Sequence, residues 1–257
     1  MADWRAFPYT GDYTFDAAQL TASWARLHRG DAEPLPRDPA VLQAWMLFHN
    51  GAFRQAADAG LRAGPEGITV ANKAASVHAN YLENHEKTRL DLMHEIAVRA
   101  EQQQTALPAN PNAWYFQAYA LGRYAQGISV AKALAQGLGN RVKTALEKTI
   151  ALSPGHADAH AALATFHAEV IDKVGSLIGG MTYGARKDVS LALFKKALDL
   201  NPDSAAVLVE YANGLVMLEG ESRMEEATAL YRQAAALKPL DATERLHVEL
   251  ARAELGE

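Results

Sequence analysis

Three histidines in this sequence have a spacing that could bind a metal ion. His156, His160 and His167 occupy positions i, i+4 and i+11, which lie close to one stripe of a helix. A zinc site needs three or four ligands that converge on one point and are held by further hydrogen bonds. The alternative is that these imidazoles pack between helices, and the same two interpretations apply to His78 and His85. We expect the packing role and predict no metal site.

Familiar catalytic motifs are missing from the sequence. It has no Gly-x-Ser-x-Gly motif and no Gly-Lys-Ser/Thr phosphate loop, and the pair His94 and Glu95 leads to Val98 where a metalloprotease has its second histidine. The chain has no cysteine, which excludes a thiolate nucleophile, a disulfide and a cysteine-based zinc site. We predict no catalytic residues, no cofactor and no enzyme activity. An acid–base pair assembled from distant residues is the open alternative.

A glycine-punctuated segment, GSLIGGMTYG at residues 175–184, reads as an elaborated turn between helices. Its large side chains are Leu177, Ile178, Met181 and Tyr183. Glycine lets a backbone approach its neighbour closely, so we favour a tight fold that buries these side chains. The alternative is an exposed apolar flap that binds a partner or a second copy of the chain.

Composition limits the partners and the location. The 257 residues carry 25 lysines and arginines against 30 aspartates and glutamates, so no overall positive field concentrates nucleic acid at the surface. The least interrupted apolar stretch, residues 174–185, is shorter than the roughly 20 residues of a membrane span. The first residues lack the basic and apolar regions of a signal peptide. We predict a cytoplasmic protein, or a periplasmic one only if an export signal is missing from this sequence.

The elements that must position these residues are helices. Apolar residues recur at three- and four-residue spacing and alternating β-branched residues are scarce, which predicts an all-α fold. The stretches 144–160, 191–207 and 229–245 share one plan, in which a helix with a large apolar residue is ended by proline. The large residues are Leu146, Phe194 and Tyr231, and the prolines are Pro154, Pro202 and Pro239.

This plan resembles the tetratricopeptide repeat (TPR), which orders a small residue, an aromatic residue, an alanine and a proline. The order is met by Ala227, Tyr231, Ala234 and Pro239, and nearly as well by Ser190, Phe194, Ala197 and Pro202. Segments 51–56 and 110–114 are similar to parts of further copies. The resemblance implies a TPR-like right-handed α–α superhelix of stacked hairpins, because one hairpin alone cannot bury its apolar face. It also implies that His160 and His167 pack between helices.

Two repeats are longer than the usual 34 residues. Pro154 and Pro202 are 48 residues apart, so about 14 extra residues lie between the two helices of that repeat. The segment from Gly127 aligns with the segment from Gly175 at the same offset, which predicts two neighbouring apolar extensions. We expect a single domain over 1–257, with an N-terminal arm and capping helix (1–37), repeats (38–240) and a C-terminal capping helix (241–257).

In TPR proteins the first helix of each repeat lines a concave groove, and residues four apart share that side. The resemblance implies that a partner contacts three rows of side chains: Tyr115, Tyr119 and Arg123; Thr165 and Glu169, beside Ala161; and Asn213 and Met217, beside Val209. The alternative is that the aromatic N-terminal arm fills the groove and Arg123 only pairs with Glu169. Some TPR modules grip a C-terminal carboxylate with lysine and asparagine, but Val209 stands where that lysine belongs.

These observations predict a non-catalytic scaffold that binds a protein or peptide through its groove, its apolar insertion or both, with homo-oligomerisation as an option. The alternatives are a carrier of a small apolar ligand and an enzyme with a non-obvious site. Residues from 166 onward are similar to uncharacterised bacterial TPR proteins. They are more weakly similar to the TPR subunit of periplasmic TRAP-type transporters, which is anchored through a cysteine that this chain lacks, and to eukaryotic microtubule-associated TPR proteins.

Overall fold

Helices make up the regular structure of residues 4–256, the part of the chain that the computed structural model describes. The predicted all-α class is confirmed, and no strand occurs within these residues. The α-helices are α1 (Ala17–Leu27), α2 (Pro39–His49), α3 (Phe53–Arg62), α4 (Ile68–Val77), α5 (Glu86–Ala106), α6 (Pro111–Gln126), α7 (Val130–Ala135), α8 (Leu138–Leu152), α9 (Ala157–Val174), α10 (Ser176–Tyr183), α11 (Lys187–Leu200), α12 (Ala205–Glu219), α13 (Met224–Ala235) and α14 (Ala242–Glu254). Between them lie two 3₁₀ turns, η1 (Pro65–Gly67) and η3 (Gly220–Arg223), and one π-helical turn, η2 (His78–Leu82).

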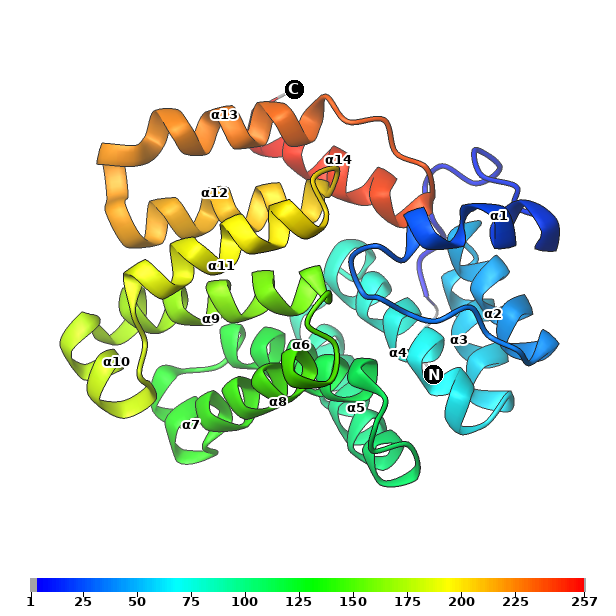
Figure 1. Cartoon of the computed structure of the whole chain (residues 1–257), viewed down its shortest axis with the longest axis horizontal. Coiled ribbons are helices and arrows are strands. Elements are labelled where there is room, and N and C mark those ends of the chain that lie inside the picture. The colour runs from blue at the N-terminus through cyan, green and yellow to red at the C-terminus, as the bar shows by residue number, and fades with distance from the viewer. Residues whose placement is uncertain (1–3, 257) are drawn as a thin grey trace. The chain divides into compact units, whose positions relative to one another are not determined.

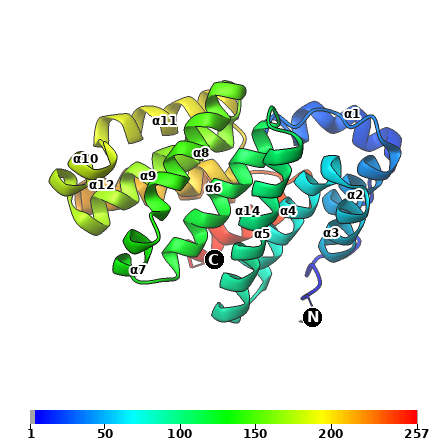
Figure 2. The ribbon, with the colours of Figure 1, turned by 90° about the horizontal axis from the view of Figure 1, so that it is seen from below.

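The helices group into two compact units. Unit 1 comprises Met1–His28, Glu33–Leu152 and Leu240–Thr243, and unit 2 comprises Arg29–Ala32, Ser153–Pro239 and Glu244–Glu257. In unit 1 the helical hairpins α2/α3, α4/α5 and α6/α8 follow one another, and Figure 2 shows α4, α5 and α6 side by side. In unit 2 the hairpins α9/α11 and α12/α13 are followed by α14 (Figure 1).

The three repeat prolines fix helix boundaries. Pro154 and Pro202 lie two residues beyond the ends of α8 and α11, and Pro239 lies four residues beyond the end of α13. The next helices, α9, α12 and α14, each begin three residues after the proline. Proline has no backbone N–H and disfavours helical geometry in the residue before it, so the preceding helix must end. Ser204 then caps α12 by accepting a hydrogen bond from the Val207 amide at 3.2 Å.

The N-terminal arm, residues 4–15, packs on α2 and α3 of unit 1 and on the turn between them through aromatic and hydrogen-bond contacts. Phe7 is buried and lies edge-on to Phe53 at the start of α3, with ring centroids 5.9 Å apart. Phe15 and Asn50 exchange two hydrogen bonds: the Phe15 amide donates to Asn50 Oδ1 at 2.6 Å, and Asn50 Nδ2 donates to the Phe15 carbonyl at 3.0 Å. Phe7 and Phe15 therefore anchor the arm at separate points.

Local sequence explains where α1 begins. Asp16 accepts a hydrogen bond from the Gln19 amide, and the Gln19 side chain accepts one from the Asp16 amide, which forms a capping box. Leu20 and Trp24, four residues apart, face the core and are buried. The Trp24 indole N–H donates to the Glu33 carbonyl at 2.9 Å. This bond ties the helix to the chain that leads into α2.

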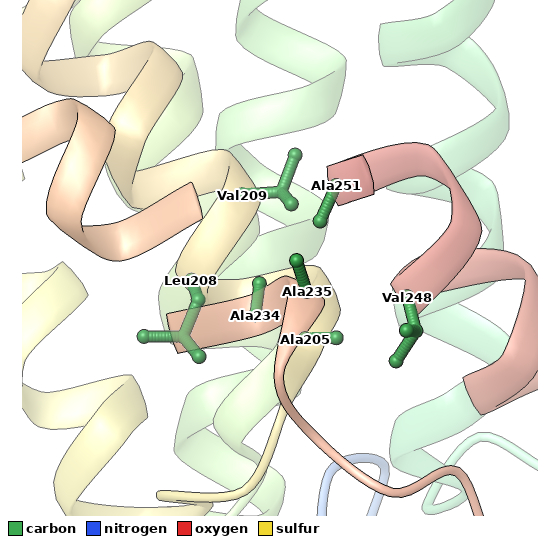
Figure 3. Close-up of a cluster of buried hydrophobic side chains, with 7 residues drawn as sticks. All are labelled: Ala205, Leu208, Val209, Ala234, Ala235, Val248 and Ala251. Atoms are coloured by element: carbon green, nitrogen blue, oxygen red, sulfur yellow. The ribbon is translucent and has the colours of Figure 1, made fainter. Parts of the chain in front are cut away.

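The C-terminal helix α14 covers the last hairpin of unit 2. A cluster of buried apolar side chains joins α12, the end of α13 and α14 (Figure 3). Most members are alanines, whose small side chains let the helices approach closely. Val209 belongs to this cluster and is 4% exposed, so it lies beneath α14 and not on an open surface. The cluster consists of Ala205, Leu208, Val209, Ala234, Ala235, Val248 and Ala251.

Both predicted insertions are short helices. α7 lies between α6 and α8, and α10 lies between α9 and α11 (Figure 1). The interpretation of residues 175–184 as a turn is therefore wrong, because residues 176–183 are helical. Glycine lowers helix propensity but does not forbid helix, and packing on a neighbour offsets its cost. Gly184 ends α10 in the left-handed conformation, with φ of +64°.

Candidate partner-binding surfaces

The three most exposed large apolar side chains among residues 4–256 all lie on α10. Met181 is 82% exposed, Leu177 75% and Ile178 58%. The expectation that the glycine-punctuated segment buries these side chains is therefore wrong, and only Tyr183 is half-buried. Leu177 and Met181 are four residues apart and share one helix face with Ile178 beside them. Contiguous exposed apolar surface of this kind is typical of binding sites.

The opposite face of α10 is held against α9. A Cβ atom on Gly179 would lie 2.8 Å from Val170 Cγ1, so only glycine permits this approach. The Tyr183 ring lies edge-on to Phe166, with centroids 6.1 Å apart. The Ala185 amide donates to the Gly179 carbonyl at 3.1 Å and closes the end of the helix. These contacts dock α10 on α9 and leave its apolar face to the solvent.

The predicted row on α6 forms a stripe of two aromatic rings and a cation. Tyr115 is buried, whereas Tyr119 and Arg123 are half-buried. The Tyr115 and Tyr119 centroids are 6.0 Å apart, and the Arg123 guanidinium carbon lies 5.3 Å from the Tyr119 centroid. Arg123 Nη1 also donates to Gln126 Oε1 at 3.2 Å. Tyrosine and arginine are enriched at interface hot spots, and their stacking here pre-organises both side chains.

The predicted rows on α9 and α12 take part in contacts within unit 2. The Thr165 hydroxyl donates to Glu210 Oε2 at 3.2 Å and joins α9 to α12. The Tyr231 hydroxyl of α13 donates to Asn213 Oδ1, so this amide serves the α12/α13 hairpin. Glu169 and Met217 are half-buried. These rows offer less free surface than α10 does.

The three histidines with metal-ligand spacing bond to nearby backbone atoms. His156 caps α9, and its Nδ1 accepts a hydrogen bond from the amide three residues later at 3.1 Å. His160 Nε2 donates to the Pro154 carbonyl at 3.0 Å, and His167 Nδ1 accepts from the Arg186 amide at 3.3 Å. All three side chains are buried. Within residues 4–256 no three histidine or carboxylate side chains form a group that could hold a metal ion.

Sequence motifs do not reveal a buried chain of titratable side chains in unit 1. Asp241 Oδ2 lies 2.6 Å from His49 Nδ1, and His49 Nε2 lies 3.2 Å from His28 Nε2. Because the carboxylate only accepts, we assign the His49 proton to Nδ1 and a His28 proton to Nε2. The three residues are far apart in the sequence, so no local pattern could have indicated them. Together they fasten residues 240–243 to α2 and the end of α1.

Two tyrosines of the α12/α13 hairpin have a raised pKa and stay protonated at neutral pH. Burial, with a further contribution from Glu226, raises the pKa of Tyr211. Burial, followed by Glu254 and Glu210, raises the pKa of Tyr231. Both groups are therefore hydrogen-bond donors at neutral pH, and neither is suited to act as a general base.

The succession of helical hairpins is similar to that in a solved structure of another protein. Among solved structures, the chain is similar to a thermophilic TPR protein from Thermus thermophilus, with a TM-score of 0.57 and 17% sequence identity. The match covers 83% of this chain and 97% of that chain. This chain has a TPR-type fold. No family model matches the sequence, and no curated protein does.

The TPR fold accounts for the paired helices and for the two short helices between them. The paired helices of every hairpin correspond to one repeat, and α7 and α10 are additions between the paired helices of two repeats. Within the described residues, each helix is too short or too polar to cross a lipid bilayer.

Proposed function

We propose that this TPR-fold chain is a non-catalytic scaffold that binds a protein or peptide through the apolar face of α10, with the α6 stripe as a second contact surface. One observation carries the proposal. Leu177 and Met181 are 75% and 82% exposed, although the same helix is fixed to α9 by Gly179 and Tyr183. A helix that is already fixed loses little conformational entropy when its exposed apolar side chains bind a partner.

The chemistry of α10 indicates what kind of partner it suits. Burying a leucine, isoleucine or methionine completely contributes about 1.5–3 kcal/mol, so three such side chains form a patch of hot-spot size. A short apolar helix face fits an amphipathic helix of a partner better than an extended acidic or basic peptide. The exposed face carries no charged group that would bind a charged peptide, because its side chains are Leu177, Ile178 and Met181.

The alternatives receive less support. A carrier of a small apolar ligand encloses most of the ligand surface, whereas the α10 side chains that would line such a pocket are open to the solvent. An enzyme needs titratable groups that converge in a cleft. In this chain His156, His160 and His167 are engaged with backbone atoms.

Affinity capture with matched variants tests the proposal. The tagged chain is incubated with extract of the source cells, and bound proteins are identified and quantified by mass spectrometry. We expect a stoichiometric partner whose retention falls at least about tenfold when Ile178→Asp and Met181→Asp are combined, since about 1.4 kcal/mol of lost apolar contact suffices. The matched control is Met224→Asp, which also charges an exposed side chain of unit 2 (44% exposed) but lies on α13.

The outcomes are distinguishable. Unchanged retention by the double variant, with helix content unchanged by circular dichroism, contradicts the role of α10. Recovery of an untagged copy of this chain as the partner identifies self-association. Tyr119→Ala and Arg123→Ala test the α6 stripe separately, and wild-type retention by both removes it from the proposal.

A further inference from the structure

His78, the first residue of η2, fastens the beginning of the N-terminal arm to unit 1. Its side chain is buried, and its ring stacks on Trp4 with centroids 4.3 Å apart and planes inclined by 17°. The Arg5 amide N–H donates to His78 Nε2 at 3.1 Å. A ring nitrogen that accepts a hydrogen bond carries no proton, so this contact requires a neutral imidazole with its proton on Nδ1.

The surroundings of the ring disfavour a second proton. His78 Nδ1, which carries the proton of the neutral ring, is shielded from solvent and has no hydrogen-bond acceptor that would stabilise a charged ring. The charged groups nearby are Arg5 on the arm, Arg54 on α3 and Glu83 after η2, and His85 at the start of α5 lies beside Glu83. Burial, as the largest effect, lowers the pKa of His78, and Arg54 acts in the same direction, whereas Glu83 opposes them.

The arm makes a second contact at the same place. With the Asn84 amide oriented so that its oxygen faces the arm, the Arg5 guanidinium donates to this oxygen at 2.6 and 3.0 Å. The Glu83 amide donates to the His78 carbonyl at 2.9 Å and closes the π-helical turn between them. Residues 4 and 5 thus dock on His78 and Asn84, separately from the Phe7 anchor on α3.

Protonation of the ring has two opposing effects on this contact. A charged imidazole stacked on the Trp4 indole gains a cation–π attraction, which favours a closed arm. However, a proton on Nε2 removes the acceptor of the Arg5 amide and charges a buried ring, which Arg54 disfavours and Glu83 favours. The Arg5 amide bond is lost outright when Nε2 is protonated, and burial lowers the pKa of His78, so we expect the second effect to be larger. The docking of residues 4 and 5 on His78 is then fully stable above the ordinary histidine pKa of about 6.5, and it weakens as the pH falls below that value.

We propose that His78 is an acid-released catch for the N-terminal arm: a proton on Nε2 frees the Arg5 amide and detaches residues 4–6, while Phe7 and Phe15 hold the rest. Release uncovers the His78 ring and the η2 turn, so unit 1 presents a different surface in acid than at neutral pH. This device is independent of the partner-binding role of α10.

Nuclear magnetic resonance on the full chain tests the catch between pH 7.5 and 5.0. The two observables are the hydrogen-exchange protection factor of the Arg5 amide, corrected for the intrinsic rate at each pH, and the chemical shift of the His78 ring. We expect protection to fall at least tenfold, with one midpoint below about 6.5 for both observables. In His78→Gln, whose amide oxygen accepts at every pH, protection should not change with pH. The control His85→Gln, at an exposed neighbouring histidine, should behave as wild type.

Two results would overturn the catch. One is a pH-dependent loss of Arg5 protection in His78→Gln equal to that of wild type. The other is an equal loss of protection in α12 of unit 2, which would mark general acid unfolding. If His78→Gln does not fold, the wild-type titration decides alone, because separate midpoints for the Arg5 amide and the His78 ring are incompatible with the proposal.

Discussion

At the scale of single residues, glycines decide how closely neighbouring helices approach. A Cβ atom on Gly214 of α12 would lie 2.4 Å from Phe194 Cε2 of α11, whereas one on Gly122 of α6 would meet no atom within 4 Å. Overpacking in Gly214→Ala should lower the free energy of unfolding by about 1–3 kcal/mol. Replacing a helical glycine offsets roughly 1 kcal/mol of this loss. Gly122→Ala should stabilise by about 0.5–1 kcal/mol. Urea unfolding measures both, and a Gly214→Ala chain as stable as the Gly122→Ala chain would refute the steric argument.

The sequence could show which residues are present but not which atoms they would meet. Histidine illustrates the limit, because one ring serves as donor, acceptor or ligand according to its neighbours. His156 caps a helix, a position usually taken by serine, threonine, aspartate or asparagine. Asp241 and His49 meet across the fold. Tyr115, Tyr119 and Arg123, by contrast, share a stripe because helical spacing alone places them together.

At the scale of elements, the docking of α10 depends on one of its two central glycines. A Cβ atom on Gly179 would lie 2.8 Å from Val170 Cγ1, whereas the nearest contact of a Cβ on Gly180 would be the Ala185 carbonyl oxygen at 3.6 Å. Gly179→Ala should push α10 away from α9, and Gly180→Ala should leave it docked with a higher helix propensity. We expect faster hydrogen exchange of the α10 amides in the first variant and slower exchange in the second. Equal exchange in both variants would show that the close approach does not hold the helix.

Helix boundaries were the most predictable part of the fold. Pro154, Pro202 and Pro239 act through local covalent geometry, which needs no tertiary information. The helical state and exposure of residues 176–183 were not predictable. Their apolar composition suggested burial and their glycines suggested a turn, but packing against α9 overrides the local preference.

At the scale of the whole molecule, the predicted single domain requires cooperative unfolding. The chain passes between the units more than once, because residues 29–32 belong to unit 2 and residues 240–243 to unit 1. All four tryptophans lie in unit 1, so tryptophan fluorescence reports unit 1, whereas far-ultraviolet circular dichroism reports the helices of both units. We expect the two urea transitions to coincide, as a two-state domain requires. A fluorescence midpoint displaced from the dichroism midpoint would divide the chain into two folding domains.

The membership of α14 in both units has a practical consequence for deletion mapping. Shortening the chain after Pro239 would remove Asp241 from its bond to His49 in unit 1 and Val248 and Ala251 from the apolar cluster of unit 2. A truncated protein that no longer captures its partner would thus report damaged folding of both halves and not the location of the binding residues. Point substitutions on the solvent side of α10 avoid this ambiguity.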